Sequence, residues 1–294
     1  MTRTKTSLLR AATLLCILLA LAPLYAQINL EWTTPQKPFR IAGNLYYVGS
    51  RDLASYLIVT PAGNILINGN LQTSPPQIRA SVEALGFRWA DTKILLNGQA
   101  HFDHSAGNAA ILRQTGAKLM VMDADVSTME SGGRSDFAHL PQFPPAHVSR
   151  ILHDGSKVTL GGVTLTAHKT AGHTRGCTTW TMQVKDDRGR ILNVVIIGGF
   201  AALDSYRLIA TPSHPASYPG IARDFERTFA TLKSLPCDVF LGAHGGYFNL
   251  QQKLKETGPQ GDSRWIDPAG YRRTVDEAQQ AFELRLKQQK LAAQ

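Results

Sequence analysis

The sequence predicts an α/β fold in one domain. Runs rich in β-branched and aromatic residues, typical of strands, alternate along the chain with segments of helical periodicity. The 294 residues contain no low-complexity linker or short repeat that would divide them into separate domains. Three of the β-rich runs end at a short polar loop that contains histidine. A sandwich of sheets that brings strand ends together would gather these loops at one site.

The first 26 residues have the layout of a secretory signal. "MTRTKTSLLR" carries basic residues and no acids, and an apolar run, Ala11–Ala22, follows it. This run is too short to span a membrane comfortably. We expect cleavage after Ala26, which leaves 27–294 as the folded domain of a periplasmic or secreted protein.

Strands and helices are predicted in alternating order along this domain. β-Branched and aromatic runs broken by Pro-Ala-Gly-Asn and Asn-Gly turns predict strands at 44–50, 54–70 and 92–99. A Ser-Pro start and a glycine stop predict a helix at 74–87. The later elements are a helix and strand in 106–125, a strand pair in 156–174, a strand at 190–200, a helix and strand in 218–244, and a terminal amphipathic helix at 267–290.

The charge pattern argues against nucleic acid as a partner. Loss of Arg3, Lys5 and Arg10 with the signal would leave 28 basic and 22 acidic residues, a net charge of +6. These charges are scattered and form no basic tract with interleaved aromatic residues, so they indicate a solvated surface. Cys177 and Cys237 remain, and export permits a disulfide between them, but sequence alone does not decide their distance.

The segment "NGQAHFDHSAG" (97–107) places two histidines and an aspartate at His-x-Asp-His spacing. Imidazole and carboxylate are zinc ligands, and one short loop can supply two neighbouring metal positions. Alone, the motif is equally compatible with a surface role. "AGHTRGCTTW" (171–180) and "GAHGGYFN" (242–249) add two more strand-end histidines, His173 and His244, so the combination predicts a metal centre. The remaining histidines, His139, His147, His153, His168 and His214, are expected to be solvated or hydrogen-bonded.

Together these segments resemble the metallo-β-lactamase superfamily and, within it, the subclass B3 metallo-β-lactamases. The resemblance runs from "EWTTPQKPFRIAGNLYYVGS" to the terminal helix, and "GHTRGCTTW" with the "EW…P…PF" entry carries the subclass. It implies an αββα sandwich with a zinc site at one edge of the two sheets, a β-lactam as the small-molecule partner, and antibiotic resistance as the biological role. No membrane span is expected, and we expect a monomer.

The resemblance also implies two sets of zinc ligands. The first zinc would be held by Gln99, His101 and His173, and the second by Asp103, His104 and His244. Gln99 stands where family members usually have histidine. A glutamine amide is a weaker donor than imidazole, although its carbonyl oxygen can bind a metal. Either one or two zinc ions per chain are therefore expected.

Two other departures from the family pattern concern support of the site. Asn68 stands where the superfamily often has an aspartate that helps to hold the histidine loop, and we expect its amide to suit a glutamine neighbour. The subclass often bridges a cysteine at the position of Cys237 to one near the terminal helix. Tyr271 lies there in this chain, so that disulfide is expected to be missing.

A further departure concerns the substrate carboxylate. Phe200 and Ala202 occupy the stretch where many family members have serines that contact it. Neither side chain has a hydrogen-bond donor. The remaining candidates are the second zinc, backbone N–H groups, Ser205, and Arg134 in the glycine-rich segment 130–137, which the sequence predicts to be a flexible loop. For Arg134, an ordinary solvated charge is the competing interpretation.

Three functions compete. The first is zinc-dependent hydrolysis of the β-lactam amide bond, with Asp103 holding the second zinc and orienting water. The second is another hydrolase of the superfamily, such as a glyoxalase II-like thioesterase or a lactonase. Such enzymes usually have a bridging aspartate near the position of Gly199, and here the nearest acid is Asp204. The third is a secreted metal-binding protein without turnover. The absence of a bridging aspartate, the export signal and five intact ligands favour β-lactam hydrolysis.

Overall fold

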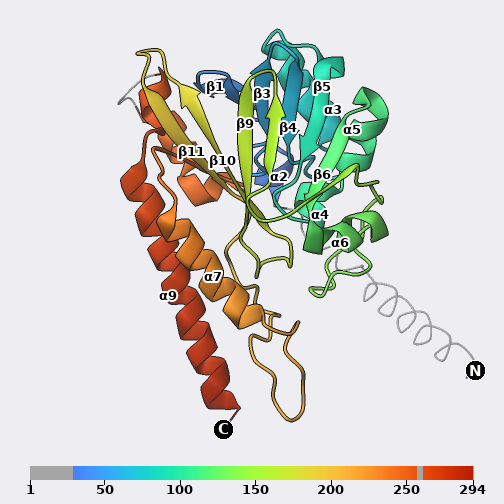
Figure 1. The fold of residues 1–294 in the computed structure, drawn as a ribbon, viewed down its shortest axis with the longest axis vertical. Coiled ribbons are helices and arrows are strands. Elements are labelled where there is room, and N and C mark those ends of the chain that lie inside the picture. Colours follow the sequence, from blue (N-terminus) through green and yellow to red (C-terminus); the bar gives the residue numbers. More distant parts are fainter. Residues whose placement is uncertain (1–28, 257–260, 294) are drawn as a thin grey trace, which may run out of the picture.

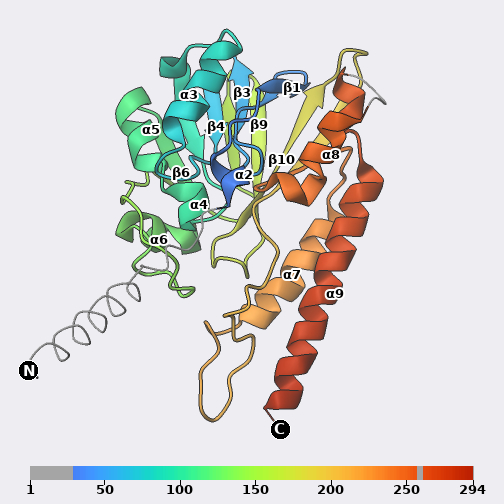
Figure 2. The ribbon, with the colours of Figure 1, turned by 180° about the vertical axis from the view of Figure 1, so that it is seen from behind.

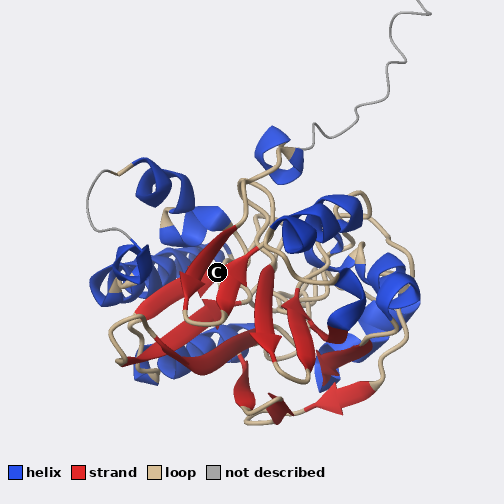
Figure 3. Ribbon diagram, turned by 90° about the horizontal axis from the view of Figure 1, so that it is seen from above, coloured by secondary structure: helices blue, strands red, loops and turns tan. Residues whose placement is uncertain are grey.

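The computed structural model describes residues 29–256 and 261–293. The predicted signal segment, residues 1–26, lies outside the described residues. Two sheets lie between layers of helices (Figures 1 and 3), as the αββα prediction requires. Among the described helices, none combines the length and the apolar composition needed to cross a membrane.

The first sheet has seven strands that lie side by side in chain order. Strands β1 to β4 pair antiparallel, and β4 to β7 pair parallel. Their bounds are β1 Phe39–Ala42, β2 Leu45–Tyr47, β3 Tyr56–Thr60, β4 Gly63–Ile67, β5 Thr92–Leu96, β6 Lys118–Met122 and β7 Arg150–Leu152.

The second sheet has five strands in the spatial order β12-β11-β10-β9-β8. Strands β11 and β12 are parallel, and the other pairs are antiparallel. The bounds are β8 Lys157–Leu160, β9 Val163–Lys169, β10 Thr178–Lys185, β11 Ile191–Ile197 and β12 Val239–Gly242.

The helices begin and end at residues of the expected kinds. Pro75 starts α3, Asp267 caps α9 through Gly270 N–H, and Gly116 ends α5 with a φ of 69° that favours glycine. The α-helices are α2 Leu30–Thr33, α3 Pro75–Ala84, α4 Phe102–Ser105, α5 Asn108–Thr115, α6 Val126–Ser131, α7 Ile221–Ser234, α8 Leu250–Lys255 and α9 Pro268–Ala292. The short 3-10 helices are η1 Trp89–Asp91, η2 Asp123–Asp125, η3 Gly245–Phe248 and η4 Gly261–Trp265.

Both faces of the first sheet are buried. Along β4, Ile65 and Ile67 belong to the core between the sheets, whereas Leu66 packs with Ile78 of α3 and Ile111 of α5 on the outer face. This double burial explains why the strands are nearly continuous apolar runs. On the far side of the second sheet, α7 and α9 lie side by side (Figures 1 and 2), with aromatic contacts among Phe225, Phe229 and Phe282.

Cross-sheet hydrogen bonds join the sheets at the edge where the histidine loops emerge. The Tyr56 hydroxyl donates to the Gly242 carbonyl at 2.6 Å, and the Trp180 indole donates to the Asn97 carbonyl at 3.2 Å. Thr178 N–H donates to the Gly98 carbonyl at 2.7 Å. These contacts hold the loop that follows β5 against β10 and the end of β12 against β3, at the same edge of the sandwich.

The structure differs from the sequence predictions at several places. Strand β10 was not predicted, although alternating burial along Thr178–Lys185 matches its Thr and Trp content. The segment 92–99 is a strand only to Leu96, because its last residues turn into the histidine loop. The segment 130–137, predicted to be a flexible loop, begins within α6, and its Gly132 and Gly133 are buried and donate hydrogen bonds to the carbonyls of Met129 and Thr128.

Candidate metal centre

The loop after β5 is held in place by side chains on both sides of it. The side-chain Oδ1 of Asn68 accepts a hydrogen bond from Gly98 N–H at 2.9 Å. The Ser105 hydroxyl donates to the Gln99 carbonyl at 2.9 Å, and Asn97 contacts both residues. Asn68 therefore holds the loop as the sequence predicted, although through the neighbour of Gln99 rather than through the glutamine amide.

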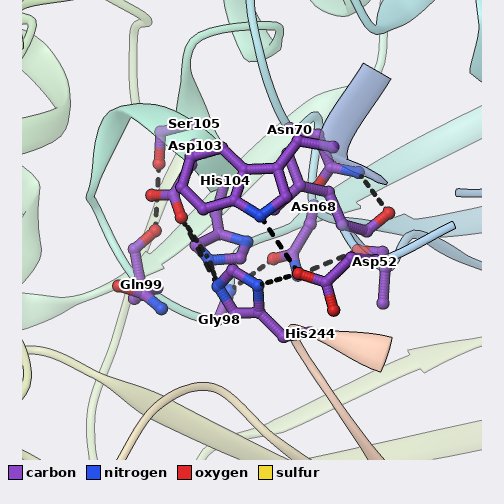
Figure 4. A network of polar contacts seen from close by, with 12 residues as sticks. Asp52, Asn68, Asn70, Gly98, Gln99, Asp103, His104, Ser105 and His244 are labelled. Atoms are coloured by element: carbon purple, nitrogen blue, oxygen red, sulfur yellow. Dashed lines mark hydrogen bonds and ion pairs between the residues drawn. The ribbon is translucent and has the colours of Figure 1, made fainter. Parts of the chain in front are cut away.

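Asp103, His104 and His244 form one compact group of possible metal ligands. The first two lie on the single-turn helix α4, and His244 follows β12. His104 Nε2 lies 3.1 Å from His244 Nε2 and 3.2 Å from Asp103 Oδ2, and His244 Nε2 lies 3.5 Å from the same oxygen. Figure 4 shows the three side chains converging from two loops.

These separations match the needs of a tetrahedral zinc site. Ligand atoms about 2.0–2.2 Å from a zinc ion and at tetrahedral angles would be roughly 3.3–3.6 Å apart. The three observed distances lie within a few tenths of an ångström of this range. Two imidazole nitrogens and one carboxylate oxygen are also a donor set that zinc accepts. The group therefore fits a metal ion without rearrangement of the backbone.

The charges around this group favour a cation. Burial alone would lower the pKa of His244, but the carboxylates of Asp103 and Asp52 outweigh it and raise that pKa to about 9. Burial would also raise the pKa of Asp103, yet the neighbouring His104 and His244 hold it well below its ordinary value. The carboxylates of Asp52 and Asp103 thus make a positive charge favourable at this group.

The second possible group consists of His101, His173 and Gln99. The rings of His101 and His173 meet edge to face with centroids 4.7 Å apart. The Gln99 amide nitrogen donates to the Gly198 carbonyl at 2.9 Å, which leaves its Oε1 buried with no hydrogen-bond partner among the described residues. His173 Nδ1 donates to the Ala201 carbonyl at 2.7 Å, so its Nε2 lone pair is available.

Electrostatics keep these two histidines in the form that binds metals. Burial lowers the pKa of His173 to about 4, and burial together with the nearby His173 lowers the pKa of His101 well below its ordinary value. Both imidazoles are neutral at neutral pH, as a metal ligand must be. An unpartnered buried Gln99 oxygen beside two neutral imidazoles fits a second, weaker metal position.

The close packing of Gly199 against His173 limits which side chains can join this group. A Cβ atom at Gly199 would lie 2.7 Å from the His173 ring and 3.3 Å from the Gln99 amide nitrogen. A bridging carboxylate at this position would therefore displace His173. Asp204, the nearest acid in the sequence, is fully exposed and pairs with Arg285. No carboxylate from this strand end reaches the site.

The predicted substrate contacts lie in different environments. Phe200 is buried and packs on Tyr247 with ring centroids 4.5 Å apart, Ala202 is half-buried, and Ser205 is exposed. Arg134 is exposed, and in the part of the chain that the structure describes no hydrogen bond, ion pair or ring contact joins it to the site. Among arginines, Arg175 lies on the His173 loop, with its guanidinium over the Phe137 and Tyr218 rings at 5.9 Å and 5.2 Å.

Sequence reasoning missed three carboxylates around the centre. Asp52 Oδ2 lies 2.8 Å from His244 Nδ1, Asp136 Oδ2 lies 3.7 Å from His101 Nε2, and Asp125 hydrogen-bonds to residues beside His101 and His173. None belongs to a recognisable motif. Cys177 and Cys237, whose pairing the sequence left open, are free, and burial raises both thiol pKa values.

The fold and the site together define a two-sheet α/β protein with a metal centre of histidine and carboxylate ligands at one sheet edge. The family model of the metallo-β-lactamase superfamily matches residues 51–187. The chain belongs to this superfamily, because it also covers nearly all of several solved relatives at well over 30% identity.

Three such relatives illustrate the match. The FEZ-1 metallo-β-lactamase from Legionella gormanii is 49% identical, with a TM-score of 0.83 over 87% of this chain and 98% of that one. BJP-1, a subclass B3 enzyme of Bradyrhizobium japonicum, is 34% identical, with a TM-score of 0.81 over 90% and 98%. The class B3 di-zinc enzyme LRA-12 from an Alaskan soil metagenome is 38% identical, with a TM-score of 0.80 over 87% and 96%.

Proposed function

We propose that this protein is an exported zinc-dependent β-lactamase that hydrolyses the amide bond of β-lactam antibiotics. The single observation that carries the proposal is the convergence of Asp103, His104 and His244 at zinc-like separations beside neutral His101 and His173. The names of the solved relatives support β-lactams as the substrate class, and the name of LRA-12 supports two zinc ions. The basic and apolar N-terminal segment supports export.

In this proposal the two groups hold two zinc ions. Gln99, through Oε1, would bind the first with His101 and His173, and Asp103, His104 and His244 would bind the second. Bound zinc supplies Lewis-acid polarisation of the lactam carbonyl and activation of water near neutral pH. One ion, in the second group, is the alternative, because that group contains no weak ligand.

The residues of this chain hold these groups ready for the metal. The Asp52 carboxylate accepts the Nδ1 proton of His244, and the Ala201 carbonyl accepts that of His173, so each ring turns Nε2 inward. Asp103 stays ionised and would accept a hydrogen bond from the attacking water. The side chains of Phe200 and Ala202 supply no hydrogen-bond donor, so the substrate carboxylate would be bound by the second zinc, backbone N–H groups, Ser205 or Arg134.

Gly199 argues against the alternative hydrolases. The thioesterase and lactonase hypothesis requires a bridging carboxylate that the contact between Gly199 and His173 excludes in this arrangement. The hypothesis of a secreted metal-binding protein without turnover is disfavoured because five ligands of the expected types are intact: His101, Asp103, His104, His173 and His244.

The test uses purified protein lacking residues 1–26, loaded with zinc, and a chromogenic cephalosporin, with zinc content measured on the same sample. A glutathione thioester and a simple lactone serve as comparison substrates. We expect cephalosporin hydrolysis that is lost on dialysis against a chelator and restored by zinc. Hydrolysis that survives complete metal removal, or a zinc-loaded protein that cleaves only the thioester or the lactone, would overturn the proposal.

A further inference from the structure

Asp125 is a buried carboxylate that the proposed chemistry does not use. It ends η2 and directly precedes α6, and it is almost completely inaccessible to solvent. Its Oδ2 accepts hydrogen bonds from Ala100 N–H at 3.0 Å and from the Thr174 hydroxyl at 2.7 Å. Its Oδ1 accepts one from Gly176 N–H at 2.7 Å.

The three donors belong to two loops that are far apart in the sequence. Ala100 lies between Gln99 and His101, and Thr174 directly follows His173. One carboxylate group therefore joins the backbone that carries Gln99 and His101 to the backbone that carries His173. Bonds of this kind to an ionised acceptor are shorter and stronger than neutral ones.

The contact with the His173 loop is tight enough to restrict the sequence there. A Cβ atom at Gly176 would lie 2.5 Å from the Asp125 backbone nitrogen and 2.8 Å from its Cβ. Any other residue at position 176 would push the loop away from Asp125. The two segments thus approach at backbone distance, which fixes their separation more closely than a contact between long side chains could.

A stability role does not account for this arrangement. No lysine, arginine or histidine forms an ion pair with Asp125 within 29–256 and 261–293. Burial of a carboxylate without a cation is costly, and apolar residues of similar volume often stabilise such positions better. The carboxylate instead holds three hydrogen-bond donors from two loops close together, so its role is to position those loops.

We infer that Asp125 is a positioning residue that sets the distance between the Gln99–His101 segment and His173, and hence the geometry of the first metal position. The metal part of this inference rests on the proposed function. Asp52 has the corresponding place at the other group, where it accepts hydrogen bonds from His244 Nδ1 at 2.8 Å and Gly246 N–H at 2.9 Å. Each of the two ligand groups thus has a supporting carboxylate that is not itself a candidate ligand.

One substitution at Asp125 and two at Thr174 test the inference. Asp125→Asn keeps the size but puts an NH₂ group against N–H or O–H donors, so at least one hydrogen bond is lost. Thr174→Val removes one donor without changing the volume, and Thr174→Ser restores it. Asp52→Asn is the matched variant for the other half of the site.

The first measurement is amide hydrogen exchange on the metal-free, full-length mature protein. We expect Asp125→Asn and Thr174→Val to speed exchange in segments 97–105 and 170–178 while 243–250 is unchanged, and Thr174→Ser to exchange like the parent. Asp52→Asn should give the reverse pattern. This measurement needs neither bound zinc nor hydrolysis, so it distinguishes failure of the inference from failure of the proposed function.

The second measurement is zinc titration against a competing chelator. Loss of a partner that orients metal ligands typically weakens metal binding about 10- to 100-fold. We expect this loss for the first position in Asp125→Asn and for the second position in Asp52→Asn. Exchange that rises evenly over the whole chain, no change in either loop, or Thr174→Ser that behaves like Thr174→Val would each overturn the inference. If Asp125→Asn does not fold, the Thr174 pair decides.

Discussion

The carboxylate of Asp52 lies 2.8 Å from Nδ1 of His244, although the two residues are 192 positions apart in the chain. The same carboxylate accepts hydrogen bonds from the Trp32 indole at 3.0 Å and from Gly246 N–H. Since Nδ1 donates to Asp52, Nε2 of His244 is the atom that faces Asp103 and His104 (Figure 4). Asp52 therefore determines which nitrogen of His244 is offered to a metal.

Substitution Asp52→Asn should weaken metal binding at the Asp103, His104 and His244 group about 10- to 100-fold, because the ring loses its anionic partner. Zinc competition with a chromogenic chelator measures the change. The Arg79–Glu83 pair on the surface of α3 provides the control, and Glu83→Gln should leave zinc affinity as it is. Equal affinity in Asp52→Asn and the parent would show that His244 needs no such partner.

Alanine substitutions should separate the two groups of ligands. We expect His104→Ala and His244→Ala to reduce kcat/KM for a chromogenic cephalosporin much more than Gln99→Ala. The second group has two imidazoles and a carboxylate, whereas the Gln99 amide is a weak donor. Steady-state kinetics with zinc in excess, and zinc content of each variant, check this. Losses of the same size in all three would make Gln99 a full ligand.

Restoring serine near the site should have different consequences at the two candidate positions. Phe200 is buried against Tyr247, so Phe200→Ser should lower the free energy of unfolding by about 3–5 kcal/mol, the range for emptying an aromatic site. Ala202 is only half-buried, and Ala202→Ser should cost less than about 1 kcal/mol. Urea unfolding of metal-free protein measures both.

The kinetic part of that prediction concerns the substrate carboxylate. Where the variants fold, a restored hydroxyl should lower KM for at least one β-lactam without changing zinc content, because it adds a hydrogen bond to the carboxylate. Unchanged kinetics in both would refute the idea that the lost serines matter. Unchanged kinetics in Arg134→Ala as well would leave the metal or the backbone as the binding group.

The pH dependence of stability should reveal the Lys253–Asp267 ion pair. Lys253 is buried, and its ammonium lies 2.9 Å from Asp267 Oδ2. Burial would raise the pKa of the Asp267 carboxyl, but Lys253 and Gly270 N–H outweigh it and lower that pKa below its ordinary value of 3.8. The pair therefore stabilises the fold above pH 3.8, and this contribution disappears as the pH falls through the folded-state pKa.

Asp267→Asn keeps an N-cap for α9 but loses the charge. We expect it to cost about 1–2 kcal/mol at pH 7, a range reduced for the partial exposure of the carboxylate, and less at pH 3. Urea unfolding at both pH values, with chelator present, gives the difference. Asp267→Ala should add a cost of about 1 kcal/mol at both pH values, because the cap is lost too. A difference between Asp267→Asn and the parent that is as large at pH 3 as at pH 7 would contradict the assignment.

Much of the architecture could be predicted because its signals are local. Proline at the start of α3, glycine at the end of α5 and continuous apolar runs in β3 to β5 reflect backbone geometry and burial that neighbouring residues determine. The candidate ligand residues could also be predicted, because three separate β-rich runs each end at a loop that contains histidine, whereas the His-x-Asp-His segment alone was equally compatible with a surface role. The neutral state of His101 and His173 could not be predicted, since it depends on burial.

The amino-acid sequence by itself determined the α/β class, the order of most elements and the side chains able to bind a metal. Only the tertiary structure decided how these side chains are supported. Asp52 and Asp125 lie outside any motif, and their partners include backbone N–H groups of distant loops, which every residue but proline can supply. Such a hydrogen bond arises only when packing of the two sheets brings distant loops within about 3 Å of each other, and no local pattern encodes that distance.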